Sequence, residues 1–397
     1  MGYRLACTGE GNGDHGRPEG EDSTRVSRRA LIAIAATAIS VGLSGVVAGS
    51  ASAATARPAV TTYSATGGLY GVASVSSSSA WAVGYAGNSS APKILMLHWN
   101  GKAWSRVTSP SVLTAAGQLS AITAVSAKSA WAVGSTGGIG TGKNHSLLLH
   151  WNGSTWSQVT SPAPVTGGSL AGLAVTGKTG WAVGYVNTNP SAPACCAGTP
   201  LVFHWNGSAW SRLSTKLGNG SYLSGVVITA ASTAWAIGGP TAMITGALAK
   251  WNGSAWSWVK DPVSGPYHPL NGIAAGPGGT VFMVGTNNNT SGPPVSARWS
   301  GSAWKTVTVS APNPSGLNAV AFAPGGTAWA AGVARSGSGT QPLVMRWNGK
   351  SWTRVSSPGG REELYGLAFS ASNYGWAIGN SESGKTVILH WNGSTWG

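Results

Sequence analysis

The segments AWAVGY at residues 80–85 and LMLHWNGKAW at residues 95–104 form the first copy of the repeat that decides the fold of this chain. The tryptophan pair that ends it recurs seven times, with spacings of 44 to 54 residues between copies. The pairs begin at Trp99, Trp151, Trp205, Trp251, Trp299, Trp347 and Trp391. The tryptophan of the first segment recurs at Trp81, Trp131, Trp181, Trp235, Trp329 and Trp376, and Phe282 replaces it once. Self-similarity at this period predicts a repeat architecture.

Each copy is predicted to form four short strands. In the second copy these are residues 119–125, 130–134, 146–151 and 155–160, separated by polar and glycine-containing breaks. The Asn-Gly between the last two strands fits a tight hairpin, closed on either two or four residues, with both tryptophans on one face. The other face is also apolar, with Met96 and Val107 in the first copy. A sheet that is apolar on both faces needs a neighbour on each side, as the blades of a propeller have.

We therefore predict an all-β fold, a seven-bladed β-propeller with four antiparallel strands per blade. The seventh copy stops within its fourth strand, at Trp396-Gly397. Residues 57–64, within an N-terminal segment 54–68, are expected to dock onto the outer edge of blade seven and close the ring. The propeller itself is placed at residues 69–397, with repeats at about 69–110, 119–162, 170–214, 222–260, 270–308, 317–356 and 364–397.

Residues 1–53 resemble an export signal. Arg28-Arg29 precedes an apolar run over residues 30–48, and Ala51-Ser52-Ala53 has the small-residue pattern of a cleavage site. The paired arginines resemble a twin-arginine signal, and the general secretory route stays open as an alternative. A permanent anchor is the other interpretation, but the run is alanine-rich and weakly apolar. We expect a secreted protein, free or associated with the cell wall, without stable membrane insertion after cleavage.

The net charge of +15 raises polyanions as partners. After residue 53 only four carboxylates remain, Asp261, Glu362, Glu363 and Glu382, against 19 lysines and arginines. These cations are spread over the repeats rather than clustered, which disfavours specific nucleic-acid binding. An anionic cell-wall polymer is the expected polyanion, and the protein is expected to be a monomer.

Catalysis has little support in the sequence. Glycoside hydrolysis needs two carboxyl groups facing each other across a sugar. Glu362 and Glu363 are adjacent and tend to point apart, which leaves Asp261 with Glu382 as the other pairing. A Ser–His–Asp site could use only His145 or His268 with Asp261, and no nucleophile-elbow motif is present. No phosphate-binding glycine loop or thiolate metal cluster is found, so no catalytic residue, cofactor or metal is assigned.

Most aromatic and basic repeat positions have a structural interpretation. A tryptophan required once per blade is expected to pack between blades. Just before each hairpin pair a basic or titratable residue recurs, at His98, His150, His204, Lys250, Arg298, Arg346 and His390. Such a ring could bind anions, but a cation–π contact or a hydrogen bond within each blade is the favoured interpretation.

Candidate ligand-binding residues lie where the copies differ. Loops between strands two and three and between blades vary in length, and in a propeller they share one face, where ligand sites usually lie. Trp258 departs from the repeat and is the candidate for an exposed aromatic. Cys195-Cys196 in the longest loop forms either a vicinal disulfide or two adjacent thiols. The remaining candidates are Asp261, Tyr267, His268, Arg361, Glu362, Glu363 and Glu382.

The pattern Leu-x-x-His-Trp-Asn-Gly-x-x-Trp, with Trp-Ala-Val-Gly before it, resembles the kelch repeat. The resemblance covers residues 69–397, and only the fourth copy has the kelch glycine doublet, Gly238-Gly239. It implies a propeller like the central domain of galactose oxidase. That branch would also imply copper held by tyrosine and histidine, which this chain does not match because its histidines mostly occupy repeat-equivalent positions. Composition and signal resemble those of secreted actinobacterial propellers.

Together these features predict a secreted binding or scaffolding propeller that recognises a glycan or cell-envelope polymer through its variable loop face. A polysaccharide-active hydrolase or lyase is the first alternative, and a protein-interaction platform is the second.

Overall fold

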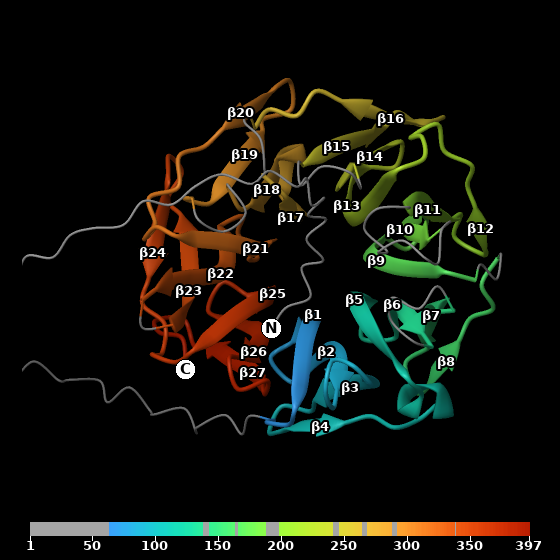
Figure 1. Cartoon of the computed structure of the whole chain (residues 1–397), viewed down its shortest axis with the longest axis horizontal. Coiled ribbons are helices and arrows are strands. Elements are labelled where there is room, and N and C mark those ends of the chain that lie inside the picture. The colour runs from blue at the N-terminus through green and yellow to red at the C-terminus, as the bar shows by residue number, and fades with distance from the viewer. Residues whose placement is uncertain are drawn as a thin grey trace, which may run out of the picture. The chain divides into compact units, whose positions relative to one another are not determined.

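The computed structural model describes residues 63–137, 143–162, 166–187, 198–240, 246–263, 268–287, 292–337 and 339–397. These residues form a closed ring of seven small sheets, and each sheet is one sequence repeat (Figure 1). The predicted fold class, a seven-bladed β-propeller of four-stranded antiparallel blades, is confirmed.

The strands follow one another from the centre of the ring outward. The first strands are β1 (Gly67–Ser76), β5 (Gly117–Ser126), β9 (Gly168–Val175), β13 (Ser221–Ala230), β17 (Leu270–Ala275), β21 (Ser315–Phe322) and β25 (Glu362–Ala371). The second strands are β2 (Ser79–Ala86), β6 (Ser129–Thr136), β10 (Gly180–Asn187), β14 (Thr233–Pro240), β18 (Val281–Gly285), β22 (Ala328–Ser336) and β26 (Tyr374–Ser381). The third strands are β3 (Lys93–Trp99), β7 (His145–Trp151), β11 (Gly198–Trp205), β15 (Ala247–Trp251), β19 (Val295–Trp299), β23 (Gly339–Trp347) and β27 (Thr386–Trp391).

The fourth strands are short and outermost. They are β4 (Trp104–Arg106), β8 (Trp156–Gln158), β12 (Trp210–Arg212), β16 (Trp256–Val259), β20 (Trp304–Thr306) and β24 (Trp352–Val355). In blade seven an isolated bridge between Trp391 and Trp396 takes the place of this strand. Two 3-10 turns, η1 (Ser111–Thr114) and η2 (Pro277–Gly279), complete the described elements.

The Trp-Asn-Gly hairpin closes on four residues. Trp99 and Trp104 are direct partners across β3 and β4. The Asn100 side chain accepts hydrogen bonds from the backbone N–H groups of Lys102 and Ala103, and Gly101 has a φ of 90°. The asparagine therefore fixes the turn, and the glycine takes a left-handed backbone that other residues rarely adopt.

Aromatic clusters join the blades, as the periodicity of the tryptophans predicts. Trp81 on β2 contacts Trp151 and Trp156 of the next blade, with ring centroids 5.1 and 5.2 Å apart. The same arrangement recurs at every interface, and it ends with Trp376 of blade seven against Trp99 and Trp104 of blade one, each at 5.0 Å. Because seven clusters of three rings fill the outer wedges between blades, the tryptophans form the core of the protein.

The first strands bulge toward the second at one repeated point. Each first strand shifts register after a buried leucine, as between Leu69 and Gly71. A Cβ added to the glycine of the Trp-Ala-Val-Gly motif, Gly84, would lie 2.0 Å from the carbonyl oxygen of Gly68. The equivalent glycine in each other blade has a similarly close backbone neighbour. The repeat keeps glycine there because no side chain fits beside the bulge.

Both ends of the described chain contribute to ring closure. His390 and Gly397 exchange two backbone hydrogen bonds, so the last residues occupy the fourth-strand position of blade seven. Upstream on the same strand, Thr386 donates its N–H to the carbonyl oxygen of Ala65 at 2.8 Å. Tyr63 packs against the core cluster between blades seven and one. This part of the expected docking segment therefore lies on blade seven, while residues 57–62 lie outside the described residues.

Candidate functional site

The ring has two chemically different faces. In every blade the turn from strand one to strand two lies beside the hairpin from strand three to strand four, as the hydrogen bond from the Trp99 indole to the Ser77 carbonyl shows. We call this side the short-turn face. The opposite side, the variable face, carries the connections from strand two to strand three and from blade to blade. All four carboxylates after residue 53 belong to the variable face.

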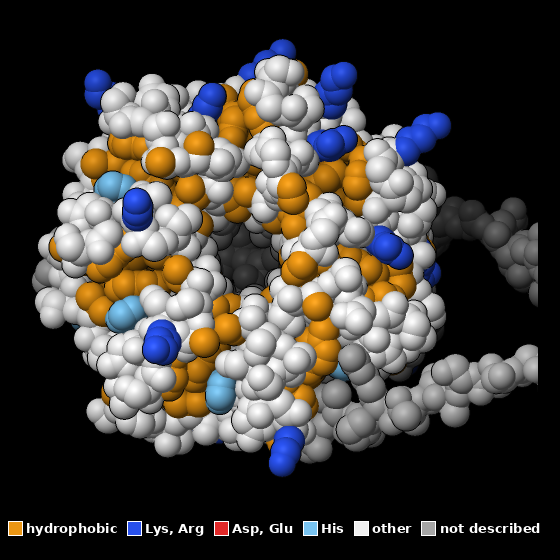
Figure 2. Space-filling view, turned by 180° about the vertical axis from the view of Figure 1, so that it is seen from behind, with side chains coloured by type: hydrophobic (Ala, Val, Ile, Leu, Met, Phe, Trp, Pro, Cys, Tyr) orange, Lys and Arg blue, Asp and Glu red, His pale blue; other side chains and the backbone are white. Residues whose placement is uncertain are grey.

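The variable face includes a ring of repeat-equivalent residues that differ from blade to blade. They follow the buried leucine at the start of each first strand, and all seven are half-buried on the innermost strands. A central opening runs through the ring that these strands surround (Figures 1 and 2). We call this set the inner belt: Tyr70, Ser120, Ala171, Ser224, Asn271, Asn318 and Tyr365.

Side-chain hydrogen bonds connect the inner belt across blades five, six and seven. The amide nitrogen of Asn271 donates to the Leu317 carbonyl oxygen at 3.1 Å. In the next blade, Asn318 repeats this contact with the Leu364 carbonyl at 3.0 Å and also donates to Glu363 Oε1 at 3.1 Å. These bonds position the Glu363 carboxylate beside the inner belt.

Glu363 is the charged centre of this region. Its Oε2 lies 3.4 Å from Nη2 of Arg335, and both side chains are largely buried. Burial first, and then the Glu363 charge and a hydrogen bond to its carboxylate, raise the pKa of Tyr365 far above its usual range. Tyr365 therefore keeps its hydroxyl proton at every physiological pH.

Blade one extends the cluster with two further tyrosines. The Tyr70 ring lies 5.8 Å from Tyr365 in an edge-on contact and 5.7 Å from Tyr85 on β2. Burial and the neighbouring Tyr85 hydroxyl raise the pKa of Tyr70 well above its ordinary value. Two neutral phenols, two amides and one ion pair thus share a continuous region over blades five, six, seven and one.

The other predicted acidic residues of blade seven lie near this cluster. Glu382 accepts the Thr340 backbone N–H at 2.6 Å and faces Arg361 at 3.3 Å, and these contacts lower the pKa of its carboxyl. Glu362 is half-buried, which raises the pKa of its carboxyl, and its Oε2 has no hydrogen-bond partner in the described part of the chain. The predicted residues Arg361, Glu362, Glu363 and Glu382 are therefore grouped in blade seven.

Asp261 and His268 form a separate pair between blades four and five. The His268 ring Nε2 lies 3.0 Å from Asp261 Oδ2, and the Val263 N–H bonds the other carboxylate oxygen. Burial raises the pKa of Asp261, opposed by these two contacts. His268 Nδ1 is buried without a hydrogen-bond partner among the described residues. The pair supplies two of the three residues of a Ser–His–Asp site, and no described hydroxyl completes it.

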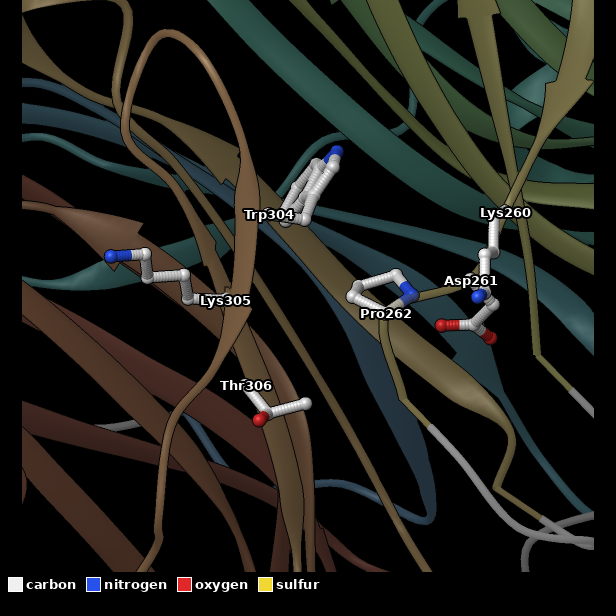
Figure 3. A pocket seen from close by; sticks show the side chains of 6 residues that line it. All are labelled: Lys260, Asp261, Pro262, Trp304, Lys305 and Thr306. Carbon is white, nitrogen blue, oxygen red and sulfur yellow. The ribbon is translucent and has the colours of Figure 1, made fainter.

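An open depression of about 650 Å³ lies next to this pair. Residues of the segment after β16 and residues of β20 line it from opposite sides (Figure 3). Its lining residues are Lys260, Asp261, Pro262, Trp304, Lys305 and Thr306. Asp261 and Glu382 are on blades that are not neighbours, so the carboxylate pairing considered from the sequence does not form.

Four predicted residues remain, and the structure describes only Trp258 among them. Trp258 is half-buried in the core cluster between blades three and four, and its indole N–H donates to the Leu217 carbonyl at 2.8 Å. It packs against the connection between these blades rather than standing exposed. Tyr267, Cys195 and Cys196 lie outside the described residues, so their predicted roles stay predictions.

The basic residue before each hairpin contacts an aromatic ring, as expected. His98 stacks on Trp81 with centroids 4.1 Å apart, and His150 and His204 repeat the contact at 4.1 and 4.3 Å. In blade four, Lys250 Nζ lies 5.2 Å from the Trp235 ring. Burial lowers the pKa of the three histidines below the ordinary 6.5. They are therefore neutral at pH 7.

These histidines are expected to make the fold acid-sensitive. Because their pKa values are lower in the folded chain, the unfolded chain binds more protons once the pH falls through 6.5. Their contribution to stability is complete above that pH and is lost as the pH falls toward the folded values. Melting temperatures measured between pH 7.5 and 5 are expected to fall less for a His98→Gln/His150→Gln/His204→Gln variant than for the wild type. If the melting temperatures of the variant and the wild type fell equally with pH, these histidines would not be the cause of the acid sensitivity.

None of the inner-belt residues was predicted as a site residue from the sequence. The signal was present, because one position directly after a repeated leucine holds tyrosine, serine, alanine or asparagine in different copies. The position lies inside a strand, whereas ligand sites of propellers are expected in the loops, so the pattern alone does not mark it as a site. Arg335 shares the variable face with the predicted residues, but its pairing with Glu363 depends on how the sheets of blades six and seven pack against each other.

Comparisons with known proteins identify the fold and no family. Neither protein-family models nor curated proteins give a match. Among solved structures, a streptogramin B lyase is similar with a TM-score of 0.53 and 14% identity over 81% of this chain and 93% of that chain. A virginiamycin B lyase from Staphylococcus aureus has the same score and identity, with 81% and 94% covered. YCF48 from Cyanidioschyzon merolae has a TM-score of 0.51 and 15% identity, with 82% and 96% covered.

Identities this low show the shared propeller fold alone. The resemblance to kelch repeats therefore stays a prediction. Within the described residues no group of His, Cys, Asp or Glu side chains is arranged to hold a metal ion. No helix in that part of the chain is long and apolar enough to span a membrane.

Proposed function

We propose that this protein is an exported binding propeller that holds a segment of a cell-envelope glycan at the inner belt. The observation that carries the proposal is the cluster of Tyr70, Tyr365, Asn318, Glu363 and Arg335 on the variable face. Aromatic faces suit the apolar side of a sugar ring, while amides, phenols and an ion pair offer donors and acceptors to its hydroxyl groups. The export step rests on the signal-like residues 1–53.

The state of the charged groups favours binding over hydrolysis. A glycosidase needs two available carboxyl groups on opposite sides of the scissile bond, about 5 to 9.5 Å apart. Among the described carboxylates, Glu363 is held by Arg335 and Asn318, Glu382 by Arg361, and Asp261 by His268. Only Glu362 has an uncommitted oxygen. Glu362 thus has a free carboxyl oxygen, while the neighbouring Glu363 is paired with Arg335. This arrangement suits binding of a glycan chain without cleavage.

Oligosaccharide binding by full-length variants tests this proposal. A panel of immobilised envelope oligosaccharides selects the strongest binder, and calorimetric titration then compares variants with the wild type. Removing both stacking rings in Tyr70→Ala/Tyr365→Ala is expected to weaken binding by about 10- to 100-fold, on the scale of losing buried aromatic contacts. The matched control, Ser120→Ala/Ser224→Ala, changes the same belt position in blades two and four and is expected to bind like the wild type.

Two outcomes would contradict the proposal. Equal binding by the tyrosine variant and the control would exclude the inner belt as the site. Shortening of the oligosaccharide that is lost in Glu362→Gln or Glu363→Gln would instead identify a hydrolase or lyase.

A further inference from the structure

The charges on the short-turn face differ from those on the variable face. None of the four carboxylates that follow residue 53 is on it, whereas lysine and arginine recur around the ring. Figure 2 shows a face with Lys, Arg and His side chains around the central opening and no coloured Asp or Glu side chain. The short-turn face therefore carries cations without any of these carboxylates, whereas the variable face carries charges of both signs.

The cations on this face are denser in blades four to six. Blades one to three carry one turn lysine each, at Lys102, Lys128 and Lys178, and a neutral histidine before the hairpin. Blades four to six carry a permanent cation before the hairpin, and blades five and six add a second one. We call these residues the cationic arc: Lys250, Arg298, Lys305, Arg346 and Lys350.

The cationic arc keeps its hydrogen-bonding capacity free. No carboxylate pairs with any of its five side chains, and none of them donates a hydrogen bond within the described part of the chain. This contrasts with Arg335 and Arg361, which are paired on the variable face. Aromatic rings hold three of the five in place: the guanidinium carbon of Arg346 lies 5.4 Å from the Trp329 ring, that of Arg298 lies 5.9 Å from Phe282, and Lys250 Nζ lies 5.2 Å from Trp235. Their positions are therefore set before a ligand arrives.

We propose that the cationic arc docks a linear phosphate-bearing polymer, such as a chain of polyol or sugar units joined by phosphodiesters. Planar guanidinium groups bind phosphate oxygens in pairs, and lysines add point charges along the chain. The adjoining depression places Trp304, Lys260 and Lys305 beside the arc, and the Asp261 carboxylate, paired with His268, also lines it (Figure 3). This surface is separate from the inner belt, so the two could act on different parts of one envelope.

The turns favour a soluble polymer over a lipid surface. The hairpin turns of the short-turn face are built of Asn, Gly, Ser, Thr, Ala and Lys, with no large apolar side chain to enter a bilayer. Interfacial membrane binding needs buried apolar area as well as basic residues. The cationic arc provides the basic residues, but the hairpin turns beside it provide no large apolar side chain for membrane insertion.

Binding of linear inorganic polyphosphate to the full-length protein tests the proposal. The variant Lys305→Gln/Arg346→Gln/Lys350→Gln removes three exposed arc charges. It is expected to weaken binding at low salt by about tenfold, since close phosphate contacts contribute more than distant charges. The control Lys93→Gln/Lys216→Gln/Lys385→Gln removes three exposed charges from the variable face and is expected to change the affinity less than about twofold, because net charge alone acts weakly at a distance.

Each other outcome would overturn the proposal. Equal weakening in both variants would mean that net charge, and not the arc, attracts the polymer. Equally tight binding of polyglutamate of the same charge would remove the preference for phosphate. Arc-dependent binding to phosphatidylglycerol vesicles that exceeds binding to polyphosphate would assign the face to a membrane surface. Oligosaccharide binding at the inner belt is expected to be unchanged in the arc variant, which separates this test from that of the proposed function.

Discussion

Replacing Trp376 with alanine is expected to lower the free energy of unfolding by about 3 to 5 kcal/mol, the usual effect of removing a buried tryptophan. Trp376 has no exposed surface, and its ring contacts both Trp99 and Trp104 at 5.0 Å. These contacts join blade seven to blade one, so the cavity would open at the seam where the ring closes. Urea unfolding of both proteins measures the change.

Phenylalanine at the same position provides the control. Blade five already carries Phe282 there, with rings 5.0 and 5.1 Å from Trp347 and Trp352. The Trp376 indole N–H has no hydrogen-bond partner in the described structure, so Trp376→Phe loses volume but no polar contact. We expect it to cost about 1 to 2 kcal/mol. An alanine variant as stable as the phenylalanine variant would contradict the role of this cluster in closure.

Removing Trp396 and Gly397 is expected to lower the free energy of unfolding by at least as much as the Trp376→Ala substitution. Trp396 is 4% exposed and packs 5.5 Å from Trp391 and 5.9 Å from Trp329. Gly397 exchanges two backbone hydrogen bonds with His390. The deletion therefore loses a buried indole, about 3 to 5 kcal/mol, and hydrogen bonds worth about 1 kcal/mol each. The urea midpoint of the truncated chain gives the result.

Trp396→Phe distinguishes the packing from the backbone contribution. It keeps the hydrogen bonds and most of the aromatic contact, so its midpoint is expected between those of the wild type and the deletion. An unchanged midpoint in the truncated chain would show that these two residues do not close blade seven.

The fold could be predicted because its causes are repeated. The Asn-Gly turn forms within one blade, whereas the paired tryptophans and the small residues of the first strands pack against the neighbouring blade. Each of these features recurs in nearly every copy, and seven copies make the pattern unambiguous. The motif glycine, as at Gly84, also has a local cause in the bulge, although the sequence alone does not reveal that contact.

The candidate site could be predicted only in part, because its contacts cross blades. The sequence indicates Glu362, Glu363 and Glu382 as rare carboxylates and Arg361 as a residue of the variable face, and all four lie in blade seven. The contacts of Glu363 with Arg335 and Asn318 join residues 28 and 45 positions apart. Such contacts depend on how neighbouring sheets pack, which spacing along the chain does not specify. Trp258 was expected to be an exposed aromatic because it departs from the repeat. In the structure its indole N–H instead donates to the Leu217 carbonyl oxygen, so the departure serves packing within the fold.

In the proposed function the inner belt, and not the repeated aromatic positions, contacts the glycan. Hydrogen–deuterium exchange of the full chain, with and without a saturating amount of the best-binding oligosaccharide, tests this contact most directly. We expect slower exchange in peptides that cover residues 67–71, 315–319 and 362–366, and no change in the hairpins at residues 99–104 and 151–156. Protection confined to those hairpins, with none at the starts of the first strands, would contradict the proposed function.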